Sequence, residues 1–150
     1  MEKQNKIIKE IVEKLLKEIG VESTVEVENN EESFTVALDG GEDNALLIGK
    51  HGNTLSSLEL IITLITSNKL GEFKRVTLEV GSYRAEREQY LQELADKLKE
   101  EVIESGYEKS VRGLKPWERR FLHMYLEEDE EVMTESVGED RERTLIIKKK

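Results

Sequence analysis

A glycine-flanked segment, Gly49-Lys50-His51-Gly52, carries residue types suited to contact with a phosphate-bearing chain. Glycine has no Cβ atom, so the backbone there can approach a ligand closely. Lys50 adds a positive charge and His51 adds ring donors. Asn53 is expected to cap the next helix, whose free N–H groups and positive dipole end would face the same position. The segment therefore predicts a site for a phosphodiester backbone.

A second candidate site lies on one face of an expected helix. Arg119 and His123 are four residues apart, so both point to the same side of a helix. Arginine binds phosphate with a forked set of donors, and histidine at this spacing adds another donor. Further basic residues that would extend this nucleic-acid-binding surface are Arg120, Lys115 and Arg112. Between residues 109 and 123 the chain carries five basic side chains and one carboxylate, which predicts a local basic patch.

Each segment also has a purely structural interpretation, which the residues alone leave open. The glycines could serve a tight turn between two helices, and Arg119 could be a surface residue beside a partly buried capping His123. Trp117 fits either base stacking or core packing. Four further aromatic residues fall on expected apolar positions and are expected in the core: Phe34, Phe73, Tyr90 and Tyr107.

The first site is expected to be positioned by three helices and three strands in the first half of the chain. Apolar residues recur at helical spacing from Ile7 to Ile19, and Gly20 follows where a helix would end. Two runs of alternating residues joined at Asn29-Asn30 predict a β-hairpin. The expected elements are a helix over 7–19, strands over 24–28 and 34–38, a helix over 45–48, a longer helix from 53, and a strand over 73–80. Asn44 is the candidate cap of the helix over 45–48.

The second half is expected to open with a long helix over 83–105, which Gly106 ends. Pro116 stands where a further helix would begin. The remaining expected elements are a short strand near 109–111, a helix over 117–126, and strands over 132–137 and 144–147. These patterns predict an α+β fold with domains 1–81 and 82–150 and the long helix at their junction. Each module would place helices on a three-stranded sheet.

Composition excludes several classes of protein. The chain has no cysteine, which excludes disulfides, a thiol nucleophile and a thiolate zinc site. No apolar run approaches the roughly 20 residues of a membrane span, so we expect a cytoplasmic protein without membrane insertion. The net charge of −10 argues against nucleic-acid binding unless a basic patch is local. No catalytic constellation stands out, so no enzyme activity, cofactor or metal is expected.

The motifs, taken in order, resemble two known modules. The hairpin before Gly49-Lys50-His51-Gly52 and the apolar helix after it resemble a KH domain with the helix-first, type II arrangement. In that family the G-x-x-G loop holds about four single-stranded nucleotides. The string from Pro116 through Arg119 and His123 to residues 134–139 and 143–147 resembles the R-3-H domain, which binds single-stranded nucleic acid. A KH domain followed by an R-3-H domain is similar to the Jag family of bacterial RNA-binding proteins, also called the SpoIIIJ-associated family. The segment over 81–87 also resembles that family's junction.

The resemblance implies a non-enzymatic protein that binds single-stranded RNA, with single-stranded DNA as a further candidate ligand. It implies a post-transcriptional regulator or RNA chaperone linked to cell-envelope, division or sporulation processes. A small KH protein is the implied partner, and a homo-oligomer is the other candidate assembly. The extra N-terminal domain of many members is not expected here, and the turn over 136–140 lacks the family's usual proline. The alternative function is an acidic protein-interaction module that acts through a partner KH protein with little direct RNA affinity.

Overall fold

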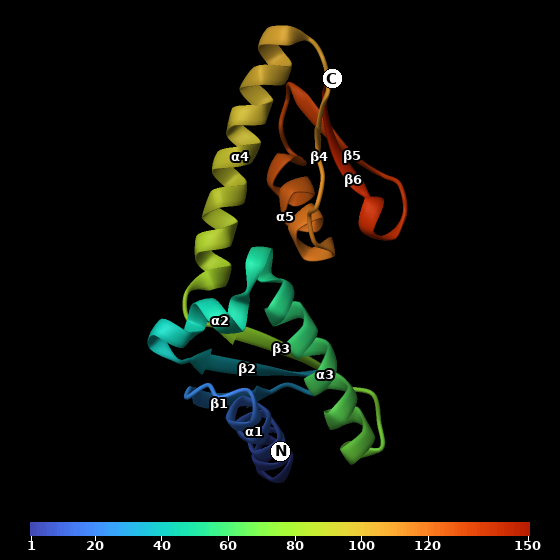
Figure 1. The fold of residues 1–150 in the computed structure, drawn as a ribbon. Coiled ribbons are helices and arrows are strands. Elements are labelled where there is room, and N and C mark those ends of the chain that lie inside the picture. Colours follow the sequence, from blue (N-terminus) through green and yellow to red (C-terminus); the bar gives the residue numbers. More distant parts are fainter. The chain divides into compact units, whose positions relative to one another are not determined.

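The computed structural model describes residues 1–150 and divides the chain into two compact units, Met1–Arg84 and Ala85–Lys150 (Figure 1). Each unit has its own hydrophobic core and its own three-stranded sheet. The expected α+β fold class is therefore confirmed. Helix α4 (Tyr83–Ser105) begins in the first unit and continues into the second. None of the helices is both long and apolar enough to cross a membrane.

The first unit has the order α1–β1–β2–α2–α3–β3. Its elements are α1 (Glu2–Glu18), β1 (Thr24–Asn29), β2 (Ser33–Asp39), α2 (Asn44–Ile48), α3 (Asn53–Leu70) and β3 (Arg75–Val80). Strands β1 and β2 form an antiparallel hairpin, and Asn30 accepts the backbone N–H of Ser33 at 2.7 Å within its turn. Strand β3 lies parallel to β2, because α2 and α3 form the crossover that a parallel pair needs.

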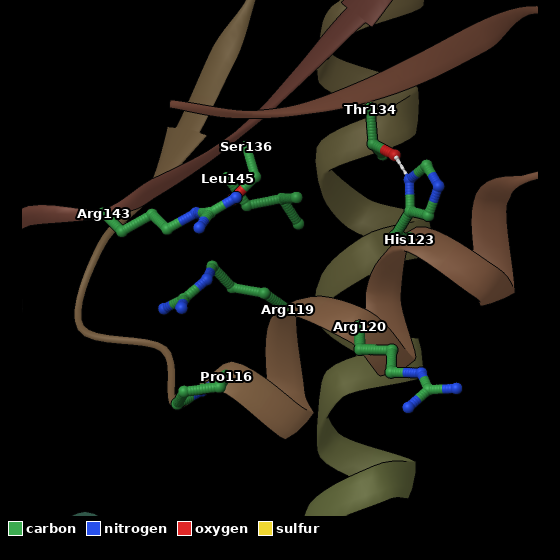
Figure 2. Close-up of a pocket in the computed structure, with 8 residues that line it drawn as sticks. All are labelled: Pro116, Arg119, Arg120, His123, Thr134, Ser136, Arg143 and Leu145. Carbon is green, nitrogen blue, oxygen red and sulfur yellow. Dashed lines mark hydrogen bonds between the residues drawn. The ribbon is translucent and has the colours of Figure 1, made fainter. Parts of the chain in front are cut away.

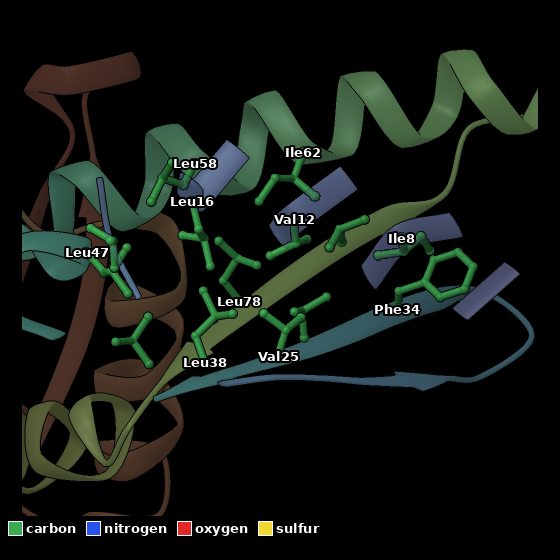
Figure 3. Packing of buried hydrophobic residues seen from close by; sticks show 14 residues of the cluster. Ile8, Val12, Leu16, Val25, Phe34, Leu38, Leu47, Leu58, Ile62 and Leu78 are labelled. Atoms are coloured by element: carbon green, nitrogen blue, oxygen red, sulfur yellow. The ribbon is translucent and has the colours of Figure 1, made fainter. Parts of the chain in front are cut away.

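The core of this unit lies on one face of the sheet. Alternate strand residues are buried or partly buried there, as a period-two pattern requires, while Glu26 and Glu79 on the other face are exposed. Side chains from the helices complete the same cluster (Figure 3). Its fully buried members include Ile8, Val12, Phe34, Val36, Leu38, Leu47, Ile62 and Val76.

Two polar side chains of α3 hold the edge strand β3. The hydroxyl of buried Thr63 accepts the N–H of Val76 at 3.1 Å, and Glu59 Oε2 accepts the N–H of Leu78 at 2.9 Å. These bonds satisfy backbone groups that an edge strand would otherwise leave unpaired. They also fix α3 against the sheet, and the glycine loop immediately precedes this helix.

The second unit packs two helices on an antiparallel sheet of order β4-β6-β5. Its elements after α4 are β4 (Lys109–Val111), α5 (Pro116–Leu126), β5 (Val132–Val137) and β6 (Thr144–Lys149). The core joins buried residues of both helices and the sheet, including Leu91, Ala95, Val102, Leu122, Leu126, Val132, Leu145 and Ile147. Helix α5 therefore presents Leu122 and Leu126 to this core and leaves the adjacent side, with Arg119 and His123, available for a site.

Two expected helix caps are wrong. Helix α2 begins at Asn44 after an Asp43 cap, and α3 begins at Asn53 after Gly52. The Asn44 side chain instead closes the turn after β2: it accepts the N–H of Gly40 at 2.8 Å and donates to Asp39 Oδ1 at 3.0 Å. Backbone and carboxylate partners in that turn, rather than the helix itself, satisfy the amide.

Of the four aromatic residues that were predicted to lie in the core, only one is buried. Phe34 is fully buried, but Phe73, Tyr90 and Tyr107 are exposed. Phe73 precedes the first residue of β3, and Tyr107 follows the end of α4. Tyr90 lies one position off the buried stripe of α4, and Arg87 stacks over its ring with Cζ 4.9 Å from the centroid. Trp117 packs against the core of the second unit.

Asp129 organises the turn that leads into β5. Its Oδ1 accepts the N–H groups of Glu131 at 2.9 Å and Val132 at 3.1 Å, and its Oδ2 pairs with Lys99 Nζ at 2.5 Å. The Lys99 hydrogen bond is the main cause that lowers the pKa of Asp129 below its ordinary value. The same bond raises the pKa of Lys99. Both charged forms are therefore stabilised by folding.

We expect Asp129→Asn to lower the urea midpoint at pH 7 by about 0.5 M, the size expected for one charge-assisted hydrogen bond. The carboxylate contributes fully above the unfolded pKa of about 4, and its contribution is lost as the pH falls through the lower folded pKa. Lys99 loses its contribution only as the pH rises through its raised pKa. Urea titrations of both proteins should show a constant difference between about pH 5 and 9 that shrinks as the pH falls below about 4. A difference that persists in acid would contradict this assignment.

Candidate nucleic-acid interface

The glycine loop connects α2 to α3 through a single turn of 3-10 helix over Lys50–Gly52. Three of its four residues have positive φ angles: 70° at Gly49, 54° at His51 and 74° at Gly52. A residue with a Cβ atom rarely adopts this conformation, although histidine does so more often than most. The loop is thus a tight, left-handed backbone segment between two helices of one unit.

Packing closes the space beside both glycines. A Cβ atom at Gly49 would lie 2.7 Å from Thr54 Cβ, and one at Gly52 would lie 2.8 Å from Tyr83 Oη. Gly52 is buried, whereas Lys50 and His51 are exposed. The backbone is therefore held from the protein side, and the two inner side chains are available to solvent. The steric interpretation and the binding interpretation of the glycines are compatible.

A pocket of about 390 Å³ lies in the second unit between α5, β5 and β6 (Figure 2). Its lining residues are Pro116, Arg119, Arg120, His123, Thr134, Ser136, Arg143 and Leu145. The lining contains three guanidinium groups, one imidazole and two hydroxyls, and no carboxylate. On a chain with a net charge of −10, this combination of lining residues is one that suits an anion.

Two of the three arginines of the pocket are held by neutral oxygen atoms. Arg119 Nη1 donates to the carbonyl oxygen of Leu114 at 2.6 Å, and Arg143 Nε donates to Ser136 Oγ at 3.0 Å. In Figure 2 these two guanidinium groups lie near one another, whereas that of Arg120 points away from them. Neutral partners orient the guanidinium groups without cancelling their charge. Their remaining N–H donors suit a phosphate oxygen.

His123 faces the sheet from one helical turn beyond Arg119. Its Nδ1 lies 2.6 Å from Thr134 Oγ1, a hydrogen bond that orients the imidazole ring (Figure 2). Thr134 and Ser136 alternate along β5, so both side chains face α5. The strand thereby supplies the hydroxyls that position His123 and Arg143.

Buried Glu118 anchors the start of α5. Only 1% of its surface is exposed; its Oε1 accepts Arg87 Nε–H at 2.7 Å, and its Oε2 accepts the N–H of Lys115 at 3.0 Å. The second bond satisfies a helix N-terminal donor, and the first ties α5 to α4 within the same unit. Glu118 therefore sets the register at which the next residue, Arg119, enters the pocket.

The structure brings together some of the predicted site residues and separates others. Arg119, Arg120 and His123 line one pocket, whereas Lys115 and Arg112 lie outside its lining. Arg143, Thr134 and Ser136 also line the pocket, although their residue types and spacing did not mark them as site residues. The sequence offered only a weak indication of these three residues. Arg143 is a basic residue just before a strand, and Thr134 and Ser136 are hydroxyl residues at alternate positions of another strand. Only the β5–β6 pairing, with Ser136 opposite Leu145, brings them beside α5.

Each of the two units matches a known protein family. Residues 5–80, about half of the chain, match the family described as KhpA/KhpB, KH domain. The chain belongs to the KhpA/KhpB KH-domain family. Residues 89–149 match the R-3-H domain, so the expected order of a KH domain followed by an R-3-H domain is confirmed. The glycine loop lies in the KH domain of this family member, and the arginine pocket lies in its R-3-H domain.

Curated relatives of this KhpA/KhpB family member carry the name RNA-binding protein KhpB. The protein of that name from Clostridium symbiosum is 34% identical over 129 residues, which cover 86% of this chain and 58% of the relative. The one from Bacillus subtilis is 35% identical over 112 residues, or 73% of this chain and 54% of the relative. The chain spans about half the length of these curated relatives.

Proposed function

We propose that this protein binds single-stranded RNA through two phosphate-binding elements, one in each domain, without catalysis. The observation that carries the proposal is the pocket beside α5, which gathers three arginines and a histidine without a carboxylate on an acidic chain. The exposed Lys50 and His51 on the left-handed KH loop are the second element. The names of the curated relatives support the same ligand class.

Two weak elements on one chain reinforce each other. Once one element holds an RNA strand, the other meets that strand at a high effective concentration, which raises the overall affinity. The predicted contribution of Arg120 belongs to this scheme as a residue of the pocket lining. Those of Lys115 and Arg112 belong to it as basic residues outside the lining. The acidic remainder of the chain opposes non-specific binding to duplexes through repulsion.

The biological role that we propose is post-transcriptional control in the cytoplasm. A protein that grips single-stranded backbone competes with base pairing and with other proteins for the same RNA segment. Such competition suits a regulator or an RNA chaperone. A link to cell-envelope, division or sporulation processes rests on the Jag-family resemblance.

Binding to a labelled random single-stranded RNA across a salt series tests the proposed function. Contacts to three or four phosphates predict a slope of log affinity against log salt of roughly −2 to −3. A duplex of the same length should bind more weakly, and single-stranded DNA shows whether the ribose hydroxyls matter. Absence of single-strand binding at low salt would contradict the proposal.

One observation favours a second candidate function, a protein-interaction module. The outer face of α3 exposes Leu60, Ile61 and Leu64, which share one side of the helix. A KH module of a second copy or of a separate KH protein could cover this face, and the acidic charge would then oppose direct RNA binding. Negligible RNA affinity together with a dimeric mass in sedimentation would favour this alternative.

A further inference from the structure

The junction between β3 and α4 packs against the segment that carries the KH loop. Gly81 donates its N–H to the carbonyl oxygen of Leu38 at 2.9 Å, and a Cβ atom at Gly81 would lie 2.9 Å from Asn44 Nδ2. Asn44 is the first residue of α2, and its amide is fixed by Asp39 and Gly40. The chain therefore enters α4 directly beside the start of α2.

The first residue of α4 reaches the other end of the same segment. Tyr83 Oη lies 2.8 Å from the Cβ position of Gly52, and the ring atoms Cε1 and Cζ lie 3.5 Å from it. Gly52 has a φ of 74° and ψ of 17°, the left-handed conformation that directs the loop into α3. A half-buried tyrosine ring has few rotamers, so it is a firm neighbour for the backbone.

We propose that Tyr83 is a positioning residue of the KH loop: its ring and hydroxyl confine Gly52 and so hold the loop in the conformation that binds RNA. The inference rests on the proposed function of the loop. Tyr83 acts through Gly52, and the RNA contacts the loop itself. The role gives the junction segment, which lies outside the G-x-x-G motif, a part in RNA binding.

A double-mutant cycle between Gly52 and Tyr83 tests this role by affinity for the single-stranded RNA. Gly52→Ala is expected to weaken binding about tenfold, since the new methyl group meets the tyrosine oxygen and the left-handed conformation is strained. Tyr83→Phe, which removes only that oxygen, should change affinity less than about threefold. The double variant should regain at least about threefold over Gly52→Ala, because the closest remaining ring atoms lie at ordinary contact distance.

The salt dependence separates positioning from direct contact. Tyr83→Ala should weaken binding about fivefold without altering the salt slope, because no phosphate contact is lost. Tyr107→Phe removes an exposed tyrosine hydroxyl elsewhere and is the matched control, with unchanged affinity expected. Circular dichroism and urea unfolding establish that each variant is folded before binding is compared.

The results of these experiments distinguish the positioning role of Tyr83 from the proposed binding of RNA. Recovery in the double variant, with an unchanged slope for Tyr83→Ala, supports the positioning role. A double variant no better than Gly52→Ala, or parent-like binding by Tyr83→Ala, would overturn it while leaving RNA binding intact. A parent protein that does not bind the RNA would overturn the proposed function, and the role of Tyr83 with it.

Discussion

The Gly49→Asp/Gly52→Asp variant is expected to bind single-stranded RNA at least about 100-fold more weakly than the parent. Each aspartate would place a Cβ atom within 3 Å of a neighbouring side chain, Thr54 at one position and Tyr83 at the other. Gly49, with φ 70° and ψ −174°, has a conformation that is almost exclusive to glycine. The variant also places two negative charges where phosphates would lie. Fluorescence anisotropy with a labelled RNA measures the loss.

A matched control for this variant is available in the same domain. Gly20 and Gly71 also have positive φ angles, of 77° and 73°, but a Cβ atom at either would meet no other atom within 4 Å. Gly20→Asp/Gly71→Asp therefore makes the same change in charge, also at two glycines with positive φ, away from the loop. Equal losses in both variants would assign the effect to net charge. Parent-like binding by the Gly49→Asp/Gly52→Asp variant would exclude the loop as a site.

A second loop variant guards against misfolding of the first. Lys50→Asp/His51→Asp changes only exposed side chains, and aspartate tolerates the left-handed conformation of His51 better than most residues do. Its stability in urea should match that of the parent, and its RNA affinity should fall by more than about tenfold. Retained affinity in this stable variant would contradict a phosphate-binding role for the loop.

The Arg119→Ala/Arg143→Ala variant is expected to lower RNA affinity by about 30- to 100-fold. Both guanidinium groups belong to the pocket and are held by neutral oxygens, so their donors and charge remain available to a phosphate. If each contacts one phosphate, the salt slope should become shallower by about 1.4. The change in slope distinguishes a lost phosphate contact from general destabilisation. A salt series on parent and variant measures both quantities.

Arg75→Ala/Arg141→Ala is the matched control for the pocket variant. Both arginines are exposed and lie outside the pocket lining, so the change in net charge is identical. We expect affinity within about threefold of the parent and a nearly unchanged slope. Arg119→Lys adds a test of geometry, because lysine keeps the charge but lacks the planar fork. An unchanged slope in the Arg119→Ala/Arg143→Ala variant would mean that the pocket does not hold phosphate.

Several features of this protein follow from local patterns in the sequence. Alternating residues predicted the strands, helical spacing predicted the helices, and the spacing of Arg119 and His123 placed both on one helix face. These patterns depend on residues that are neighbours along the chain, and the order of elements agrees with the structure. The glycine-flanked loop likewise falls between two helices, as its sequence indicates.

Local pattern was a poorer guide where a competing partner lies nearby. Asn44 has the residue type of a helix cap, but its amide bonds to Asp39 and Gly40 in the preceding turn. Tyr90 fits an apolar stripe when the helix is considered alone, yet the core of the second unit lies against Leu91 and Ala95 instead. A shift of one residue turns a helical side chain by about 100° and moves it from the core to the surface.

The sequence by itself determined the fold class, the element order, the KH and R-3-H modules and the residue types of two candidate sites. Tertiary structure alone decided which residues share a site: Arg143 joins Arg119 in the pocket, Lys115 does not, and Tyr83 closes the space beside Gly52. The physical reason is the distance along the chain over which the determining interactions act. Helices and strands follow from periodicities over a few residues, whereas the pocket depends on strand register and on the face that α5 turns away from its core.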